Sequence, residues 1–146
     1  MMLLLLSLPS FAATLVVDPT DSSAYETLEE AVAAAASGDT ITLSAHTFTE
    51  CVDTSGKDLA LVGSGVSSTR IEGAADCTNA LGVQSGETVA ISGLTVSNPG
   101  ARGIYLTGSN LSLEQVSVVD SGNDTIDGGN SGDTITGGAG NDVIDA

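Results

Sequence analysis

Aliphatic and small polar residues alternate along residues 88–98 and again along residues 110–120, and the two stretches share one pattern. A period of two indicates β-strands with one apolar face. The apolar positions recur with a constant shift of 22 residues: Val89 with Leu111, Ile91 with Leu113, Leu94 with Val116, and Val96 with Val118. A repeat of this length, made of short strands and turns, is typical of a solenoid. The pattern therefore predicts stacked coils with continuous aliphatic ladders.

Closer to the N-terminus, the pattern predicts two short strands with a helix between them. The strands are expected over residues 14–17 and 39–43. The intervening apolar positions recur at helical spacing on one face: Tyr25, Leu28, Val32 and Ala35. The pattern Ser23-x-x-Glu26 is typical of a capping box at the start of a helix. Gly38, after Ser37, occupies the favoured position just past the end of the helix.

Residues 1–13, MMLLLLSLPSFAA, form an apolar run that ends in small residues. This pattern resembles a secretory signal peptide with cleavage near Ala12 or Ala13. No Lys or Arg precedes the run, and the alternative is a buried N-terminal strand. The run is too short to span a bilayer, and no other segment is long and apolar enough. We therefore expect a secreted chain without a transmembrane segment in its mature form.

Acidic side chains dominate the composition. The 146 residues carry a net charge of −16, with Lys57, Arg70 and Arg102 as the only Lys or Arg residues. Nucleic acids and anionic membrane surfaces are excluded as partners, because both need a basic footprint. Cations are favoured instead. Aromatic residues make up only 3% of the chain, so a core of large side chains is not expected, in agreement with a stacked solenoid.

Two cysteines, Cys51 and Cys77, fit an oxidising compartment. Residues 58–63 and 69–73 indicate a less regular coil, with an insertion around Cys77. We predict a disulfide between the two cysteines, which would contribute about 3 kcal/mol in the chain-entropy model. Two free thiols are the alternative. A metal site built from two cysteines and the distant His46 is disfavoured.

Three contiguous nine-residue units close the chain: VDSGNDTID (119–127), GGNSGDTIT (128–136) and GGAGNDVID (137–145). The last unit matches G-G-x-G-x-D-x-U-x, where U is a large aliphatic residue. Ser131 replaces a glycine in the middle unit, and the first unit lacks the opening glycines. The pattern resembles the calcium-binding nonapeptide of RTX proteins. Because such arrays are usually longer, we expect a partial sequence.

The RTX resemblance implies a calcium site with a defined register. In that family the first six residues of each unit turn and bind calcium, the last three form a strand, and successive units fall on opposite sides of a flattened roll. Asp124 and Asp142 would then share one side, 18 residues apart, and Asp133 would stand on the other. Backbone carbonyls would complete the coordination of Ca²⁺. Glycines let the turns bend toward the ion: Gly122, Gly137 and Gly140. We expect about one complete site, ordered on calcium binding.

Residues 25–119 resemble the first coils of a right-handed parallel β-helix of the pectin-lyase-like type. The resemblance rests on the segments YETLEEAVAAAASGDTITL, AHTFTE and KDLALVGSG and on the coil ends LTVSN and VSVVDS. We thus expect an all-β solenoid with a signal peptide over 1–13, β-helix coils over 14–118 and a short RTX-like β-roll over 119–146. The N-terminal helix would cap the exposed strand edge. The fold hosts lyases, hydrolases, epimerases and non-enzymatic proteins alike.

The sequence favours a secreted or cell-surface calcium-binding module with a structural or adhesive role and an anionic polysaccharide or cell-surface glycan as partner. The alternative is a truncated piece of a polysaccharide lyase or an alginate-epimerase-like enzyme, which would need a clustered charge neutraliser, base and acid. No catalytic residue is predicted, because the three basic residues are dispersed along the chain and His46 is interpreted as structural. Asp39, Glu50 and Asp53 are interpreted as solvated turn residues.

Overall fold

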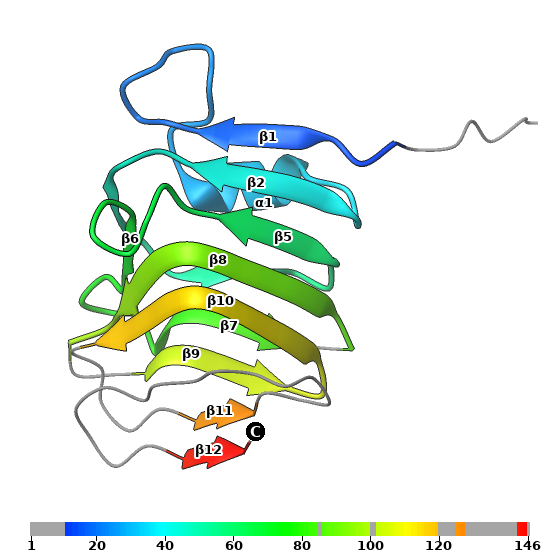
Figure 1. Cartoon of the computed structure of the whole chain (residues 1–146), viewed down its shortest axis with the longest axis vertical. Coiled ribbons are helices and arrows are strands. Elements are labelled where there is room, and N and C mark those ends of the chain that lie inside the picture. Colours follow the sequence, from blue (N-terminus) through cyan, green and yellow to red (C-terminus); the bar gives the residue numbers. More distant parts are fainter. Residues whose placement is uncertain (1–10, 85, 100–101, 120–124, 128–142, 146) are drawn as a thin grey trace, which may run out of the picture.

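The chain winds into a stack of coils in which strands of successive coils lie side by side (Figure 1). This computed structural model describes residues 11–84, 86–99, 102–119, 125–127 and 143–145. Every strand pairing between named strands of the described residues is parallel. The strands build about four turns of a right-handed β-solenoid, and the described residues contain a single short helix. The predicted parallel solenoid is therefore confirmed.

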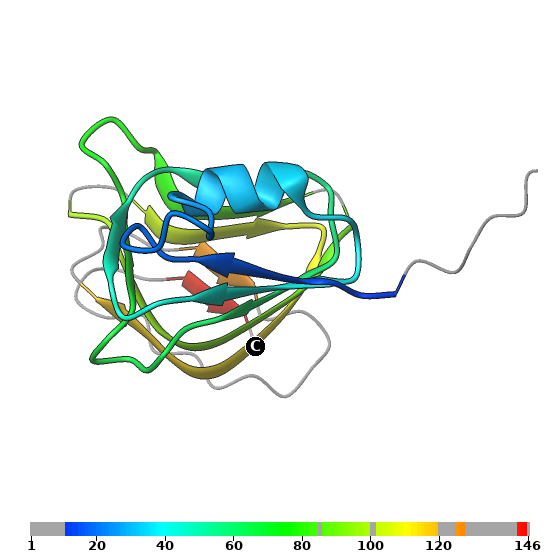
Figure 2. The ribbon, with the colours of Figure 1, turned by 90° about the horizontal axis from the view of Figure 1, so that it is seen from above.

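Three columns of strands form the faces of the solenoid (Figure 2). The first face holds β1 (Thr14–Val17), β2 (Asp39–Leu43), β5 (Leu59–Val62) and the first halves of β8 (Thr88–Ser97) and β10 (Asn110–Val119). The second face holds β3 (Thr47–Thr49), β6 (Arg70–Glu72) and the second halves of β8 and β10. The third face holds β4 (Val52–Asp53), β7 (Asn79–Gln84), β9 (Arg102–Thr107), β11 (Thr125–Asp127) and β12 (Val143–Asp145).

The register between β8 and β10 is the one that the 22-residue repeat predicts. The four predicted pairs are all present: Val89 opposite Leu111, Ile91 opposite Leu113, Leu94 opposite Val116, and Val96 opposite Val118. Earlier coils are less regular, as expected. Asp39 pairs with Leu59, a shift of 20 residues, and Leu59 pairs with Val89, a shift of 30. The extra residues of the longer coil include the insertion around Cys77.

The long strands β8 and β10 turn from the first face to the second at residues with positive φ. Gly93 has φ of 63° and Gln115 has φ of 54°. Gly63, in the preceding coil, lies directly against the first of these bends. A Cβ atom on Gly63 would lie 2.4 Å from the Gly93 carbonyl oxygen, so only glycine allows the coils to approach this closely.

Aliphatic ladders fill the space between the three faces. On the first face, Ile41, Leu61 and Ile91 stack in register and are each at most 1% exposed. The second face contributes Phe48, Ile71 and Val96, and the third Val52, Leu81 and Ile104. These residues belong to one continuous core. Small and medium aliphatic side chains therefore stabilise the fold, in line with the scarcity of aromatic residues.

Helix α1 (Leu28–Ala34) lies beside the first coil, across from β1 when the solenoid is seen from above (Figure 2). Its buried residues Leu28, Ala31 and Val32 join the core. The predicted start of the helix at Ser23 is wrong. Thr27 is the N-cap, and its side-chain oxygen accepts a hydrogen bond from the Glu30 N–H.

The later start of α1 has a backbone cause. Tyr25 pairs with the first strand: its N–H donates to the Val16 carbonyl oxygen, and its own carbonyl accepts from the Asp18 N–H, both at 2.9 Å. The turn that contains Ser23 and the bridge at Tyr25 therefore keep these residues out of the helix. The expected end at Gly38 is also displaced, because the C-cap is Ala35 in an extended conformation. Gly38 instead turns into β2 with φ of 96°.

Charged side chains of the following coil hold both ends of α1. The Glu50 carboxylate accepts hydrogen bonds from the N–H groups of Leu28 and Glu29, at 3.1 and 2.8 Å. Lys57 Nζ donates to the carbonyl oxygens of Val32 and Ala33, at 2.6 and 3.0 Å. A carboxylate at the helix start and an ammonium group at its end both complement the helix dipole.

We expect Glu50→Gln and Lys57→Met each to lower the free energy of unfolding by about 1 kcal/mol, because each removes a charged partner of free helix-end groups. Urea denaturation followed by circular dichroism would measure both. Glu26→Gln, at an exposed carboxylate just before the helix, is the matched control and should change little. Equal stability of all three variants and the parent would contradict the role of the two end contacts.

Candidate functional site

The third face continues through two short strands that belong to the first and third nonapeptides. β11 joins the solenoid through the pairing of Thr125 with Tyr105 of β9. β12 then pairs with β11, with Thr125 opposite Val143, Ile126 opposite Ile144, and Asp127 opposite Asp145. The shift between these pairs is 18 residues, which equals two nonapeptides. Strand segments of the first and third units therefore lie side by side (Figure 1).

The predicted calcium ligands lie outside the described residues: Asp124, Asp133, Asp142, Gly122, Gly137 and Gly140. In the sequence, two of these residues, Asp124 and Asp142, directly precede the paired strands β11 and β12. Asp124 directly precedes Thr125, and Asp142 directly precedes Val143, which is the partner of Thr125. The described backbone thus has the register that the Asp124 and Asp142 pairing requires.

Each basic side chain of the chain has a partner in the structure. Lys57 binds the end of α1, as described above. Arg70 Nε donates to Ser97 Oγ at 2.9 Å and lies 3.4 Å from a Glu72 carboxylate oxygen. The Arg102 guanidinium carbon lies 5.3 Å from the centre of the Tyr105 ring. The three cations are spread over different parts of the solenoid and form no common cluster.

The side chain of His46 packs edge-on against Phe48, with ring centres 5.2 Å apart. A general base needs a proton to accept from a bound substrate or nucleophile. Among the described residues, no serine or cysteine side chain is hydrogen-bonded to this ring. The aromatic contact accounts for the position of His46.

Carboxylates near the N-terminal end of the solenoid are more engaged with the backbone than predicted. Asp39 is 6% exposed, which contradicts its interpretation as a solvated turn residue. Its carboxylate accepts hydrogen bonds from the N–H groups of Ala13 and Ala36, at 2.7 and 2.8 Å. Glu50 is half-buried at the helix start, whereas Asp53 is exposed as predicted.

Backbone hydrogen bonds to the ionised form hold the pKa of Asp39 below its ordinary value, with Ala13 as the largest cause and Ala36 next. Hydrogen bonds from Thr20 lower the pKa of Asp18, and those from Ser23 lower the pKa of Asp21. A carboxylate with a lowered folded-state pKa stabilises the fold above its unfolded pKa, near 3.9. That contribution is lost as the pH falls through the folded pKa.

We expect Asp39→Asn to be less stable than the parent at pH 7 and this difference to disappear as the pH falls below about 4. The two N–H groups bind different carboxylate oxygens of Asp39, and asparagine replaces one of these acceptors with an NH₂ donor. Melting temperatures of parent and variant between pH 7 and pH 2 would test this expectation. A difference that stays constant over this range would show that the ionised carboxylate is not the stabilising form.

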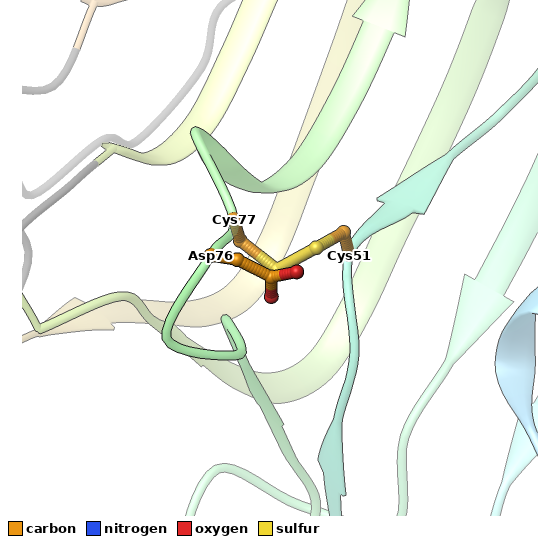
Figure 3. A group of neighbouring side chains, drawn as sticks. All are labelled: Cys51, Asp76 and Cys77. Carbon is orange, nitrogen blue, oxygen red and sulfur yellow. A yellow bond between two sulfur atoms is a disulfide. The ribbon is translucent and has the colours of Figure 1, made fainter.

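Cys51 and Cys77 come from consecutive coils and meet at one corner of the solenoid (Figure 3). Their sulfur atoms lie at disulfide distance, 2.01 Å, and their Cα atoms lie 5.5 Å apart. Asp76 was missed by the sequence reasoning. Its carboxylate lies beside the two sulfurs, and the three ligand atoms lie within 4.8 Å of one another. The sequence shows that Asp76 is adjacent to Cys77. The distance between Asp76 and Cys51 depends on the register of the coils, which the sequence does not show.

A shallow pocket of about 230 Å³ adjoins this corner on the third face. It is lined by Cys51, Val52, Asp53, Thr78, Asn79 and Gly82. Asn79 Oδ1 is buried there without a hydrogen-bond partner among the described residues. Small solutes in this pocket can reach Cys51 at the corner.

Within the described part of the chain, no helix has both the length and the apolar character that a membrane crossing requires.

Comparison with protein families matches residues 118–146 to the RTX calcium-binding nonapeptide repeat (4 copies). A comparison of the sequence with curated proteins gave no match. Among solved structures, the chain is similar to a pectin methylesterase in complex with a hexasaccharide, with a TM-score of 0.64 and 15% identity over 92% of this chain. It is also similar to the pectin methylesterase PemA from Erwinia chrysanthemi, with a TM-score of 0.58 and 15% identity over the same share.

The chain spans about half the length of these two esterases, 54% in each case. At 15% identity the likeness shows the fold alone, so it confirms the parallel β-helix and leaves activity open. The family match confirms the predicted nonapeptides and their ion, because RTX repeats are calcium-binding motifs. The chain is thus a parallel β-solenoid of the kind found in pectin methylesterases, with RTX calcium-binding repeats at residues 118–146.

Proposed function

We propose that this chain is a secreted or cell-surface module in which calcium orders the C-terminal repeats onto a rigid solenoid, and that its role is structural or adhesive. The observation that carries the proposal is the 18-residue register between β11 and β12, continued onto β9. It supports a roll in which the first and third units stack, with the β-helix as the base on which they form.

In this proposal Asp124 and Asp142 supply the carboxylates of one calcium site. Ca²⁺ takes six to eight oxygen ligands, so backbone carbonyls of the turns containing Gly122 and Gly140 supply most of the others. Asp133, which is followed by Gly137 in the next unit, belongs to the opposite side, and residues 119–146 supply no second unit on that side to complete a site. One calcium ion per chain is therefore the expected stoichiometry.

The charge of the chain supports a location outside the cell. No Lys or Arg follows Arg102, whereas the three units contain six aspartates. Without a cation these carboxylates repel one another, and calcium binding is linked to the ordering of the turns. Extracellular calcium modules bind at about 10⁻⁴ to 10⁻³ M, which suits the millimolar calcium outside cells. The apolar run at residues 1–13 and the Cys51–Cys77 pair, proposed to be an oxidised disulfide, support the same location.

We also propose that α1 protects the N-terminal end of the stack. Its buried face lies on the core, and both its ends are bound by Glu50 and Lys57. A helix in this position shields the edge of β4, the end strand of the third face, from pairing with other chains.

Calorimetric titration with calcium tests the proposed site. We expect about one ion per chain, and we expect Asp124→Asn or Asp142→Asn to weaken binding at least tenfold, because each removes a charged ligand. Asp133→Asn is the matched control and should leave the affinity of the site nearly unchanged. Circular dichroism with and without calcium should differ in the parent.

Two outcomes would reject this site. Unchanged affinity in both Asp124→Asn and Asp142→Asn would exclude the assigned carboxylates. Identical circular dichroism spectra with and without calcium would exclude the ordering of the repeats on binding.

Pectin methylesterases of the same fold give a second candidate, a fragment of a polysaccharide-modifying enzyme. Its support is the fold likeness and the pocket beside Asp53 and Asn79. Turnover of a uronate polymer by the purified chain would favour this candidate over the structural role.

A further inference from the structure

We propose that Cys51, Cys77 and Asp76 form a binding site for one zinc-class divalent ion whenever the two cysteines are reduced. This site lies at a corner of the β-helix, contains no residue of the C-terminal repeats, and does not depend on their calcium chemistry. It also differs from the metal site that the sequence disfavoured, because its third ligand is a carboxylate rather than His46.

The geometry brings three ligand atoms together from two coils. Cys51 lies between β3 and β4, whereas Asp76 and Cys77 lie in the loop between β6 and β7. The two sulfurs and a carboxylate oxygen of Asp76 all lie within 4.8 Å of one another, and Figure 3 shows the carboxylate turned toward the sulfur pair. Cys77 is buried, whereas Cys51 and Asp76 are exposed.

Neighbouring contacts fix the loop that carries two of the ligands. The Cys77 N–H donates to the Ala74 carbonyl oxygen at 2.9 Å, and Asn98 Nδ2 donates to the Cys77 carbonyl oxygen at 3.3 Å. Gly73 packs so closely on Asn98 that a Cβ atom would lie 2.5 Å from its side chain. The buried Asn98 of the next coil thus holds the loop in place, so the ligands are positioned in advance.

The donor set selects the ion. Two thiolates and one carboxylate are ligands of Zn²⁺, with Zn–S near 2.3 Å and Zn–O near 2.0–2.2 Å. Two thiolates on one tetrahedral ion lie roughly 3.8 Å apart, so the two sulfurs must move apart after reduction before they can bind one ion. Water takes the fourth position, and the adjoining pocket lined by Cys51 and Thr78 provides the entry path. Calcium is disfavoured here because it prefers oxygen ligands.

The chemical steps balance without any further component. A trialkylphosphine and water reduce the disulfide to two thiols, and the phosphine becomes a phosphine oxide. The divalent ion then replaces the two thiol protons, which are released to solvent. In either state the same two coils remain joined, through the S–S bond when oxidised and through the ion when reduced.

Cobalt is a suitable probe because its bonds to thiolates give a charge-transfer absorption in the near ultraviolet. The full chain, reduced with the phosphine, is titrated with Co²⁺ and then with Zn²⁺. We expect one Co²⁺ per chain with this absorption, displacement by Zn²⁺, and no such absorption in the oxidised chain. Carboxylates of the C-terminal repeats lack sulfur and cannot produce the signal, so failure of the calcium proposal would not affect this result.

Variants decide which residues bind the ion. Asp76→Asn should weaken cobalt binding by about 10- to 100-fold or more, since loss of an outer-shell partner already has an effect of that size. Glu114→Gln, at an exposed carboxylate on β10, is the matched control and should bind like the parent. Cys51→Ser should lose the charge-transfer absorption.

Absence of this absorption in the reduced parent, or equal affinity in Asp76→Asn and the parent, would overturn the proposal. If reduction unfolds the chain, circular dichroism of the reduced chain with and without Zn²⁺ tests the site instead. Because binding is linked to folding, Zn²⁺ should then restore the strand signal, and failure to restore it would equally overturn the site.

Discussion

Truncating Leu61 to alanine is expected to lower the free energy of unfolding by about 2–5 kcal/mol, the range for Leu→Ala in a packed core. Truncating the adjacent Val62 should cost less than about 0.5 kcal/mol, as is usual for surface substitutions. The two residues are neighbours on β5 but point to opposite sides. Leu61 is 0% exposed and Val62 is 36% exposed.

The difference follows from the position of Leu61 in the first-face ladder. Ile41 lies in register on one side and Ile91 on the other. A cavity at this place removes contacts with both neighbouring coils, and in a solenoid each coil is stabilised only by its neighbours. Val62 pairs in register with Thr42 and Ser92 on the outer surface, so its truncation leaves no enclosed cavity.

Urea denaturation of the two variants and the parent, each at saturating calcium, gives the measurement. Equal loss of stability in both variants would mean that the inward and outward faces of β5 are assigned wrongly. An unchanged slope of the transition would show that the variants differ in stability rather than in the extent of unfolding.

Removing the link between Cys51 and Cys77 is expected to cost about 3.5 kcal/mol, the value for a closed loop of this length in the chain-entropy model. The sulfurs are 26 residues apart in sequence and join consecutive coils. The double variant Cys51→Ser, Cys77→Ser should therefore melt well below the oxidised parent, and its stability should not respond to a phosphine reductant.

All samples in this experiment contain EDTA, so that neither calcium nor a thiolate-bound ion contributes. The reduced parent should then match the double variant. If the parent has the same stability before and after addition of the phosphine, the two cysteines do not form a stabilising link.

Strand positions and their register were the most predictable part of the fold. Residues such as Val89 and Leu111 recur at a constant spacing, and stacking equivalent residues is the only way for each coil to bury them. The nonapeptides were likewise recognisable, because their glycines and aspartates occur at fixed positions. In both cases the prediction rests on a sequence repeat, because equivalent residues of successive repeats become neighbours along the stack.

Features that depend on one particular contact between coils were not predictable. Ser23-x-x-Glu26 and Thr27-x-x-Glu30 are equally good capping patterns, and the choice between them is made by the backbone pairing of Tyr25. Burial of Asp39 depends on two backbone N–H groups that surround it only in the folded coil. The approach of Asp76 to Cys51 depends on coils of unequal length.

The contacts at the two ends of α1 also bear on the order in which the chain folds during synthesis. A seven-residue helix is too short to be stable alone in water, and its end partners Glu50 and Lys57 follow it in the sequence. A chain that emerges N-terminus first gains all the end contacts of α1 only when residue 57 is available. We therefore expect the first stable unit of this solenoid to include β1 to β4 and the turn that carries Lys57.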